Sequence, residues 1–498
     1  MLRDLKPAPN TQIGVIKGLT VLSEGSIKAG RVFAGACAFL TAVLVSSGAS
    51  AAPAAPIDGT KLSLLWVLPF AGVLCSIALL PTAAPRFWHR HYGLVSLFWS
   101  LAFLVPVATV FGFDATFHGF VHVLLLEYVP FMALVTALFV IAGGIYIGGS
   151  FRASPLLNSA IMLAGTILAS FAGTTGAAMI LIRPLIRVNK DRVHKVHTVV
   201  FFIFLVCNIG GALTPLGDPP LFLGYLQGVK FFWPLKFLWL QTLLAAGIVL
   251  VSFFVLDSIY YAKEGGTETP PEKIQAPFVR GLVNVPLLLL VLLAVMASGS
   301  NGYGKVEIFG TEVSWASLAR DFVLILLTVA SLVLTPSACR KHNEFNWEPV
   351  LEVGKLFAAI FITIIPAIAI LKAGPQGDFA PLFSLLGGTG TPNNVAYFWL
   401  TGLLSSFLDN APTYLVFFNA AGGDAGTLMG PMAQTLAAIS LGAVFMGANT
   451  YIGNAPNFMV KAIASHLGVR MPSFFGFMVW SMAFLIPPFV LVTLIFFR

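Results

Sequence analysis

Apolar residues in this chain gather in runs long enough to cross a lipid bilayer, and charged residues are mostly confined to the stretches between them. A helix of about 20 residues spans the roughly 30 Å hydrocarbon core of a membrane. The pattern predicts apolar helical segments at residues 62–80, 93–113, 120–147, 155–187, 196–228, 236–260, 281–298, 317–336, 350–373, 392–418, 433–465 and 472–497. The long alternating segments of a membrane β-barrel are missing from the sequence. We therefore expect an all-α polytopic membrane protein.

Composition supports this class and excludes others. Hydrophobic residues make up 58% of the chain and charged residues 10%, against about 25% charged in soluble domains. The net charge of +8 comes from Lys and Arg beside the apolar runs, which is a signal of membrane orientation. We expect membrane lipid as a partner and nucleic acid as none. The four cysteines form no metal-ligand spacing, so we expect no resident metal and no cofactor.

The amino terminus has the pattern of a targeting segment. Lys28 and Arg31 precede the apolar stretch 32–45 and a run of small residues, which predicts a signal peptide cleaved after Ala51 or Ala52. The alternative is an uncleaved first helix. The expected organisation is a targeting region at 1–52, a first transport repeat at 60–260, a cytoplasmic linker at 261–280 and a second repeat at 281–498. We expect a multi-pass protein of the bacterial inner (plasma) membrane.

One segment is too long for a single span. Residues 155–187 are interrupted by Gly173-Thr174-Thr175-Gly176 and followed by a basic cluster that ends at Lys195. A full crossing would place this cluster outside, against the positive-inside rule. A re-entrant hairpin keeps both ends on the cytoplasmic side, and 392–418 is its expected counterpart.

An internal repeat explains the second hairpin. Residues 170–176 align with 406–412, and residues 211–220 align with 447–456, both at an offset of 236. Each repeat then holds about five transmembrane segments and one hairpin, and because five is odd the second copy is inverted. Inverted repeats with broken helices at the membrane midplane are typical of secondary transporters.

Polar residues gather at the hairpin tips and at the helix breaks, where freed backbone groups can bind ions. Neutral oxygens there suit dehydrated Na⁺, and hydroxyl and amide donors suit a substrate carboxylate. The candidate ion- or substrate-binding residues are Thr174, Thr175, Asn208, Thr214, Asp218, Asp409, Asn410, Asn449, Thr450 and Asn454.

Three carboxylates are candidates for proton coupling, because a proton and a cation can compete for one buried carboxylate. They are Asp218, Asp409 and Glu127. Each aspartate has an alternative role as a helix cap, and Glu127 has one at the outer interface. Arg183 and its basic neighbours are expected to set topology, with an anion vestibule as the alternative.

Two motifs carry a resemblance. GGALTPLGDPPL (210–221) and SSFLDNAPT (405–413) resemble the ion-transporter superfamily of NhaD-type sodium/proton antiporters, arsenite permeases and citrate or dicarboxylate transporters. Over residues 60–498 the resemblance is closest to the citrate transporter/sodium:proton antiporter branch. NhaD-type members resemble one another in an Asp-Asn pair at the first hairpin, whereas this chain has Gly173-Thr174.

Two functions follow from the sequence. Asp218 and Asp409 favour a sodium (cation)/proton antiporter working by alternating access, with transported Na⁺ and protons as coupling ions. The neutral first hairpin favours a sodium- or proton-coupled citrate or dicarboxylate transporter, although an intramembrane Arg at a break, which would support a di- or tri-anion, is missing. The substrate is thus a small inorganic cation or a small carboxylate. The chain has neither the HExxH motif nor GxSxG with a matching His, so we expect no enzyme. A homodimer is compatible with the sequence.

Overall fold

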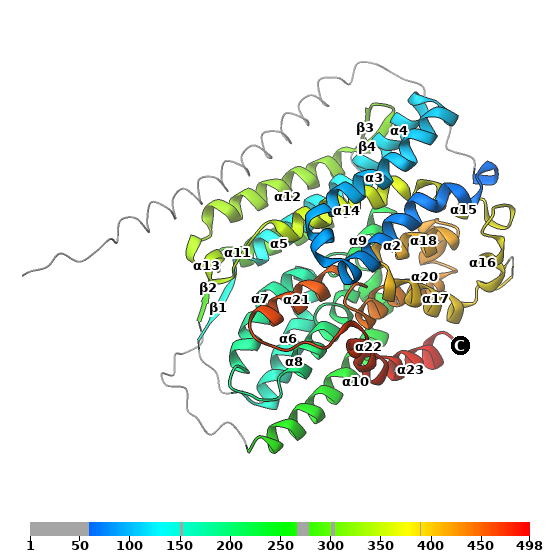
Figure 1. Ribbon diagram of the computed structural model, residues 1–498. Coiled ribbons are helices and arrows are strands. Elements are labelled where there is room, and N and C mark those ends of the chain that lie inside the picture. The colour runs from blue at the N-terminus through cyan, green and yellow to red at the C-terminus, as the bar shows by residue number, and fades with distance from the viewer. Residues whose placement is uncertain (1–58, 150–152, 266–277, 300–303, 389) are drawn as a thin grey trace, which may run out of the picture.

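The computed structural model describes residues 59–149, 153–265, 278–299, 304–388 and 390–498. Within these residues, eight helices are long and apolar enough to cross a membrane, or nine if two helices bent by 41° form one span. The prediction of an all-α polytopic membrane protein is confirmed (Figure 1). The predicted signal peptide lies outside the described residues.

The helices and strands follow the apolar runs in order. Up to residue 263 they are α2 (Leu68–Ala83), α3 (Pro85–Phe111), α4 (Phe113–Val123), η3 (Leu124–Tyr128), α5 (Val129–Ala142), β1 (Tyr146–Gly148), α6 (Pro155–Ala172), α7 (Thr174–Val188), α8 (Val196–Leu205), η4 (Ile209–Leu213), α9 (Pro219–Leu226) and α10 (Trp233–Lys263), after two short 3₁₀ turns, η1 (Gly59–Lys61) and η2 (Leu64–Val67).

From residue 278 the elements are β2 (Phe278–Arg280), α11 (Asn284–Ser298), β3 (Lys305–Ile308), β4 (Thr311–Ser314), α12 (Trp315–Leu334), α13 (Ser337–His342), α14 (Glu348–Thr363), α15 (Ile365–Lys372), η5 (Gly374–Gln376), α16 (Ala380–Leu385), α17 (Asn394–Phe407), α18 (Asn410–Ala420), α19 (Ala425–Met429), α20 (Ala433–Met446), η6 (Gly447–Asn449), α21 (Ala455–His466), α22 (Phe474–Phe484) and α23 (Ile486–Phe496).

The segment α6–α7 folds back on itself as a helical hairpin. Gly173 separates the two helices with φ +78°, a left-handed conformation that glycine adopts at little cost. At the other end, Asn158 and Asn189 exchange side-chain hydrogen bonds of 2.9 and 2.8 Å. Both ends of the segment therefore lie together, as a re-entrant hairpin requires. The side of the membrane on which they lie stays a prediction.

The segment α17–α18 has the same shape. Asp409 is the N-cap of α18 and accepts a hydrogen bond of 3.2 Å from the backbone N–H of Ala411. Near the other end of the hairpin, the Tyr397 hydroxyl donates to the carbonyl of Ala420 at 3.5 Å. Residues 392–418 therefore contain a second hairpin.

The two hairpins are fastened to the following helix breaks by matching contacts. The hydroxyl of Thr214 donates to the carbonyl of Ser170, and the hydroxyl of Thr450 donates to the carbonyl of Ser406. Each threonine oxygen also accepts a backbone N–H two residues further on, at 3.1 and 3.2 Å. These contacts recur at the sequence offset of 236, so the hairpin and break units are locally equivalent. The inverted relation of the complete repeats stays a prediction.

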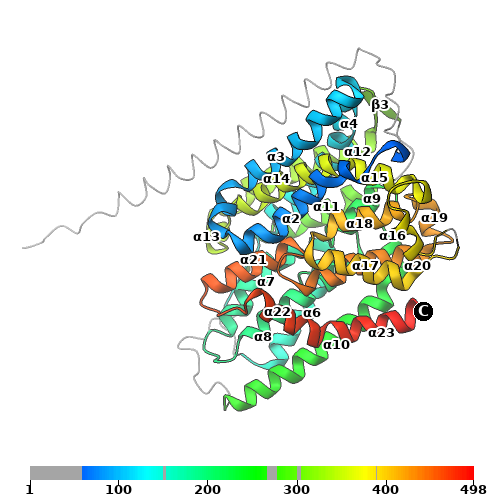
Figure 2. The same ribbon diagram turned by 45° about the vertical axis from the view of Figure 1, so that its right-hand side comes forward.

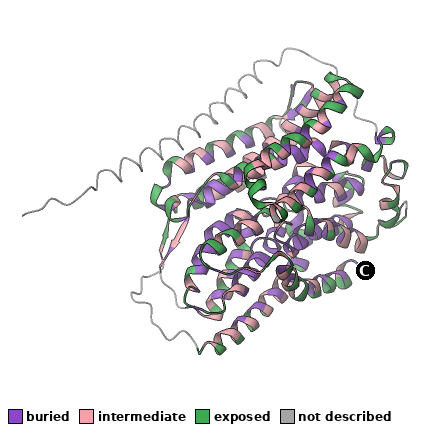
Figure 3. Cartoon of the chain, viewed as in Figure 1, coloured by how far each residue is buried: buried purple, intermediate pink, exposed green. Residues whose placement is uncertain are grey.

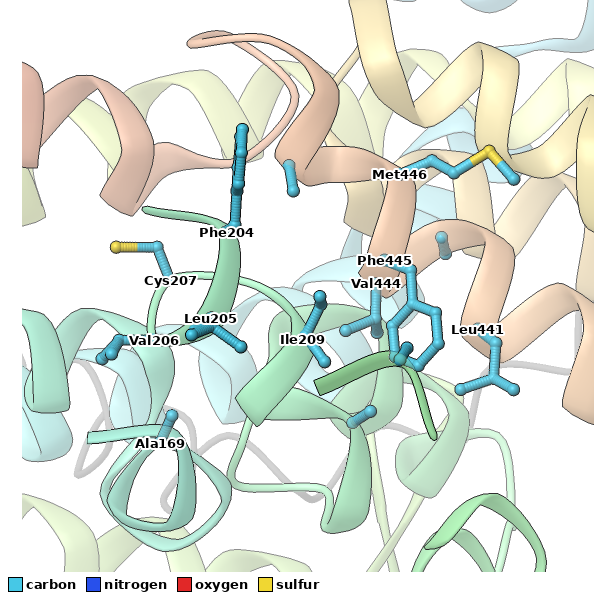
Figure 4. Close-up of a cluster of buried hydrophobic side chains, with 14 of the residues drawn as sticks. Ala169, Phe204, Leu205, Val206, Cys207, Ile209, Leu441, Val444, Phe445 and Met446 are labelled. Atoms are coloured by element: carbon cyan, nitrogen blue, oxygen red, sulfur yellow. The ribbon is translucent and has the colours of Figure 1, made fainter. Parts of the chain in front are cut away.

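The buried apolar side chains form two main clusters that mix both halves of the sequence. We call the cluster from α6–α8, α10, α17, α18 and α20–α23 the hairpin core, and the helices that supply it the hairpin region. The cluster that comes mainly from α2, α5, α11, α12 and α14 is the flanking core. Figures 1 and 2 show these two groups of helices on opposite sides of the molecule. Figure 4 shows part of the hairpin core, where Ile209 lies near Val444 and Phe445 of α20.

The outward faces of the peripheral helices are apolar. Leu97 on α3, Leu243 on α10, Leu289 on α11 and Val333 on α12 are exposed, and exposed residues line these helices in Figure 3. A soluble monomer rarely exposes apolar surface on this scale. Lipid contact on these faces explains it.

Several boundaries differ from the sequence prediction. α3 begins at Pro85 rather than near 93, because proline suits the first helical position and the charged residues that follow do not stop a helix. α10 extends to Lys263, into the predicted linker. β1 pairs antiparallel with β2, and β3 with β4. These strands are three or four residues long, and β1 overlaps the end of the predicted apolar run 120–147, so a search for spans does not find them.

Candidate functional site

Asp218 lies where the two hairpin tips and the two helix breaks meet. It directly precedes Pro219 at the start of α9, and its side chain is buried. Its carboxylate accepts hydrogen bonds from Thr174 Oγ1 at 2.9 Å, Asn410 Nδ2 at 2.5 Å and Asn454 Nδ2 at 3.0 Å. Thr174 and Asn410 begin the second helix of each hairpin, and Asn454 precedes α21. Four of the predicted site residues therefore form one cluster, which we call the Asp218 cluster.

The cluster joins equivalent positions of the two repeats. Asp218 and Asn454 are separated by 236 residues, the offset of the internal repeat, and they contact each other directly. Thr174 and Asn410 are separated by the same number and both donate to Asp218. The carboxylate is therefore shared by both halves, and a proton or cation bound there would contact both hairpin tips.

Further asparagine amides orient Asn454, which donates to Asp218. Asn454 Nδ2 also lies 3.3 Å from Asn208 Oδ1, and Asn208 Nδ2 donates to Asn457 Oδ1 at 2.7 Å. Asn457 in turn donates to the carbonyls of Gly447 and Thr450. Asn208 was among the residues predicted from the sequence, whereas Asn457 was not. The available signal was a second asparagine one helical turn after Asn454, in an otherwise apolar segment.

Asn410 presents an unsatisfied oxygen beside this carboxylate. Its Nδ2 donates to Asp218, while its Oδ1 is buried and has no hydrogen-bond partner among the described residues. A buried acceptor without a donor carries a desolvation cost of about 1–3 kcal/mol. A dehydrated cation between the Asn410 oxygen and the Asp218 carboxylate would remove this cost, because oxygen ligands are those that hard cations prefer.

Asp409 is close to the same region but has a different environment. It caps α18, as the alternative interpretation of the sequence expected, and it is only half-buried. Its side chain also lines two cavities. Asp409 is thus a helix cap and a cavity-facing carboxylate at once.

The remaining predicted residues have other contacts. Thr214 and Thr450 are directed at the hairpin backbones, as described above, and Asn449 Nδ2 donates to Ser406 Oγ at 2.9 Å. Thr175 is half-buried and lines the smaller cavity. Glu127 lines neither cavity. It lies in the π-helical turn η3, where it faces Gln227 and Lys372, and its Oε2 is buried without a hydrogen-bond partner in the part of the chain that the structure describes.

A cavity of about 300 Å³ extends from the protein surface to Asp409 and Asn454. It lies between α7 and α21 of the hairpin region and α14 of the flanking core, and exposed Glu344 and Glu348 lie at its mouth. A smaller cavity of about 60 Å³ is lined by Asp218, Thr174 and Thr175, and it shares Asp409 and Asn454 with the larger one. The Asp218 cluster is therefore next to a space that a small solute can enter.

The larger cavity has charged walls. Four carboxylates line it, those of Asp409, Glu344, Glu348 and Glu352, together with His89 and the guanidinium of Arg183. Arg183 was predicted from the sequence mainly to set topology, and in the structure it lies in the cavity wall. The orientation of one arginine on a helix depends on how that helix packs, so the sequence alone could not place it there.

The comparisons agree with the motifs. The family described as putative citrate transport matches residues 59–497, which is nearly all of the described chain. A comparison with curated proteins finds no match. The match supports a citrate-transporter type of ion transporter, in accord with the membrane helices and the polar cluster at the helix breaks. The chain belongs to the family described as putative citrate transport.

Proposed function

We propose that this protein is a secondary transporter that carries a small carboxylate of the citrate class, coupled to Na⁺ or proton movement. The observation that carries the proposal is the Asp218 cluster, where one buried carboxylate is held by both hairpin tips and by the opposite helix break. The adjoining cavity of about 300 Å³ falls at the lower end of the range for small-ligand pockets. The family to which the chain belongs supports a carboxylate as the cargo.

In this proposal Asp218 and Asp409 carry the coupling ion. Asp218 and the free oxygen of Asn410 would bind a dehydrated cation, and Asp409 would face it from the cavity. The hydroxyl of Thr175, which lines the smaller cavity and does not donate to Asp218, would bind the substrate carboxylate. The positive ends of the helix dipoles at the starts of α7 and α18 would favour the same anion.

The position of the cavity supports alternating access. It separates the hairpin region from the flanking core, and its mouth lies at the end of the molecule where Arg187 contacts Tyr146 and Trp88 contacts Glu352. The positive-inside rule assigns this basic end to the cytoplasm. The state described here is then inward-open, in a bacterial inner membrane. Movement of the hairpin region against the flanking core would expose the site to the other side.

Flux measurements test this function. Purified protein is reconstituted in proteoliposomes, and uptake of radiolabelled citrate is followed under imposed Na⁺ or pH gradients. We expect accumulation driven by at least one gradient and abolished in Asp218→Asn. Absence of citrate, dicarboxylate and tricarboxylate uptake under every gradient would contradict the proposal.

A second candidate is sodium (cation)/proton antiport without an organic substrate. The acidic excess in the cavity wall favours it, since four carboxylates face one guanidinium and one histidine. Such a lining would concentrate cations near Asp409. In this case Na⁺ added to vesicles in the absence of citrate would dissipate a preset pH gradient, and citrate would have no effect on the rate.

A further inference from the structure

The guanidinium of Arg183 has few hydrogen-bond and ion-pair partners among the described residues. It lies in the third turn of α7, and its side chain is 10% exposed. Its Nε and Nη1 are buried and have no hydrogen-bond partner among the described residues. Within the described ranges, its ion pair is between Nη2 and Glu344 Oε2, at 3.4 Å, which is long for a charge-assisted hydrogen bond.

The counter-ion of Arg183 belongs to the mouth of the cavity. Glu344 lies in the loop between α13 and α14, and its side chain is 56% exposed. Its φ of +48° is uncommon for a residue other than glycine. Glu344 can turn its carboxylate into water at little cost, whereas the buried Arg183 cannot leave the wall.

The neighbouring arginines at this end have fuller sets of partners. Arg187, one turn further on α7, donates to the Tyr146 hydroxyl and the Ile147 carbonyl. Arg340 donates to the carbonyls of Val140 and Ser331. Among the described residues, Arg183 is thus a cavity-lining arginine whose guanidinium has one hydrogen-bond partner. Once Glu344 leaves Nη2, the parallel N–H groups of Nη1 and Nη2 match a carboxylate in the bidentate geometry of guanidinium pairs.

We propose that Arg183 binds a carboxylate of the transported substrate inside the cavity and that Glu344 is the counter-ion which this carboxylate displaces. The inference rests on the proposed function and adds the residue that recognises the anion. The substrate is then a polycarboxylate. One of its carboxylates pairs with Arg183, and the cavity continues to Asp409 and Asn454, which leaves room for another. Glu352, a further carboxylate of the wall, accepts a hydrogen bond of 3.2 Å from Trp88 Nε1, so it does not compete for Arg183.

Citrate binding to the purified full-length protein, measured by isothermal titration calorimetry, tests the inference. Arg183→Gln should weaken citrate binding at least tenfold, and Arg183→Lys should fall between it and the unmutated protein because an ammonium cannot pair in the bidentate geometry. Glu344→Gln should strengthen binding several-fold, since the substrate no longer has a competitor. Arg187→Gln is the matched control on the next turn of α7 and should change the affinity less than twofold.

The outcomes separate this inference from the proposed function. Equal citrate affinity in the unmutated protein and in Arg183→Gln would overturn the role of Arg183 alone. Failure of the unmutated protein to bind any small carboxylate would overturn the inference and the proposed function together. Stabilisation of Arg183→Gln by Na⁺ in a thermal melt shows that the variant is folded. If it cannot be purified, unchanged affinity in both Arg183→Lys and Glu344→Gln would refute the inference.

Discussion

Replacement of Asp218 by asparagine removes the charge at the centre of the site while keeping its shape. The carboxylate accepts three side-chain hydrogen bonds, and an amide at this position keeps one accepting oxygen and turns the other into a donor. The new donor would face the Nδ2 of Asn410. The Oδ1 of Asn410 is unpaired among the residues that the structure describes, so a rotation of its amide by about half a turn would restore the contact.

The structural cost of Asp218→Asn should therefore be small. The loss of charge-assisted hydrogen bonds costs about 1.5–3 kcal/mol, and removal of a buried charge offsets part of it. We expect a decrease of no more than a few degrees in the melting temperature. The functional cost is larger, because removing one partner of a buried ion pair costs about 3–5 kcal/mol. This corresponds to a loss of cation affinity of roughly two to four powers of ten.

Uptake of labelled citrate by proteoliposomes, followed at increasing Na⁺ concentrations, measures this effect. Asp424→Asn is the control, because Asp424 is an exposed cap of α19 that accepts a backbone hydrogen bond from Thr427. We expect the control to match the unmutated protein and Asp218→Asn to show no coupled uptake. Normal uptake in Asp218→Asn, with an unchanged half-saturating Na⁺ concentration, would refute the assignment of Asp218 as a coupling residue.

Three further predictions concern the other parts of the site. Asp409→Asn should keep the cap of α18, since asparagine is an equally good N-cap. It should abolish coupled uptake without lowering the melting temperature by more than about 2 °C, and normal uptake would exclude Asp409 from coupling. Asn158→Ala should lower the free energy of unfolding by about 2–3 kcal/mol, because it removes the hydrogen bonds donated to Asn189 and to buried Asp257 at the base of the first hairpin. A melting temperature equal to that of the unmutated protein would contradict this. Gly217→Ala would place a Cβ 2.2 Å from the carbonyl oxygen of Gly211 and should reduce the folded yield in size-exclusion chromatography. The control is Gly247→Ala on α10, where an added Cβ meets open space and the yield should not change. Equal yields of the two variants would show that the helix break tolerates a side chain.

Much of the fold follows from the sequence, because lipid requires long apolar helices with internal hydrogen bonds. The hairpin at 155–188 was predictable from Gly173 and from the basic cluster that must stay on one side. The contact between Asp218 and Asn454 was also predictable in principle, since the internal repeat brings equivalent helix breaks together. The pairing of β1 with β2 was not, because it joins strands of three residues across more than a hundred positions of the chain.

The side-chain environment was less predictable than the positions of the breaks. Thr214 and Thr450, like Thr174, are polar residues at a break in an apolar segment. Their hydroxyls, however, donate to backbone carbonyls and hold the hairpins in place. Arg183 was assigned to topology, and helix packing directs it to the cavity. Polarity in a membrane segment thus identifies a position with a specific role, and the packing of the segment decides which role.

The most direct test of the central proposal is counterflow of labelled citrate. Liposomes that contain the purified protein are loaded with unlabelled citrate and diluted into a small amount of labelled citrate, without an ion gradient. A carrier that exposes one site alternately to each side predicts a transient accumulation of label above equilibrium. A channel cannot produce this overshoot. Absence of the overshoot, together with Na⁺-induced collapse of a pH gradient in the same liposomes, would contradict carboxylate transport.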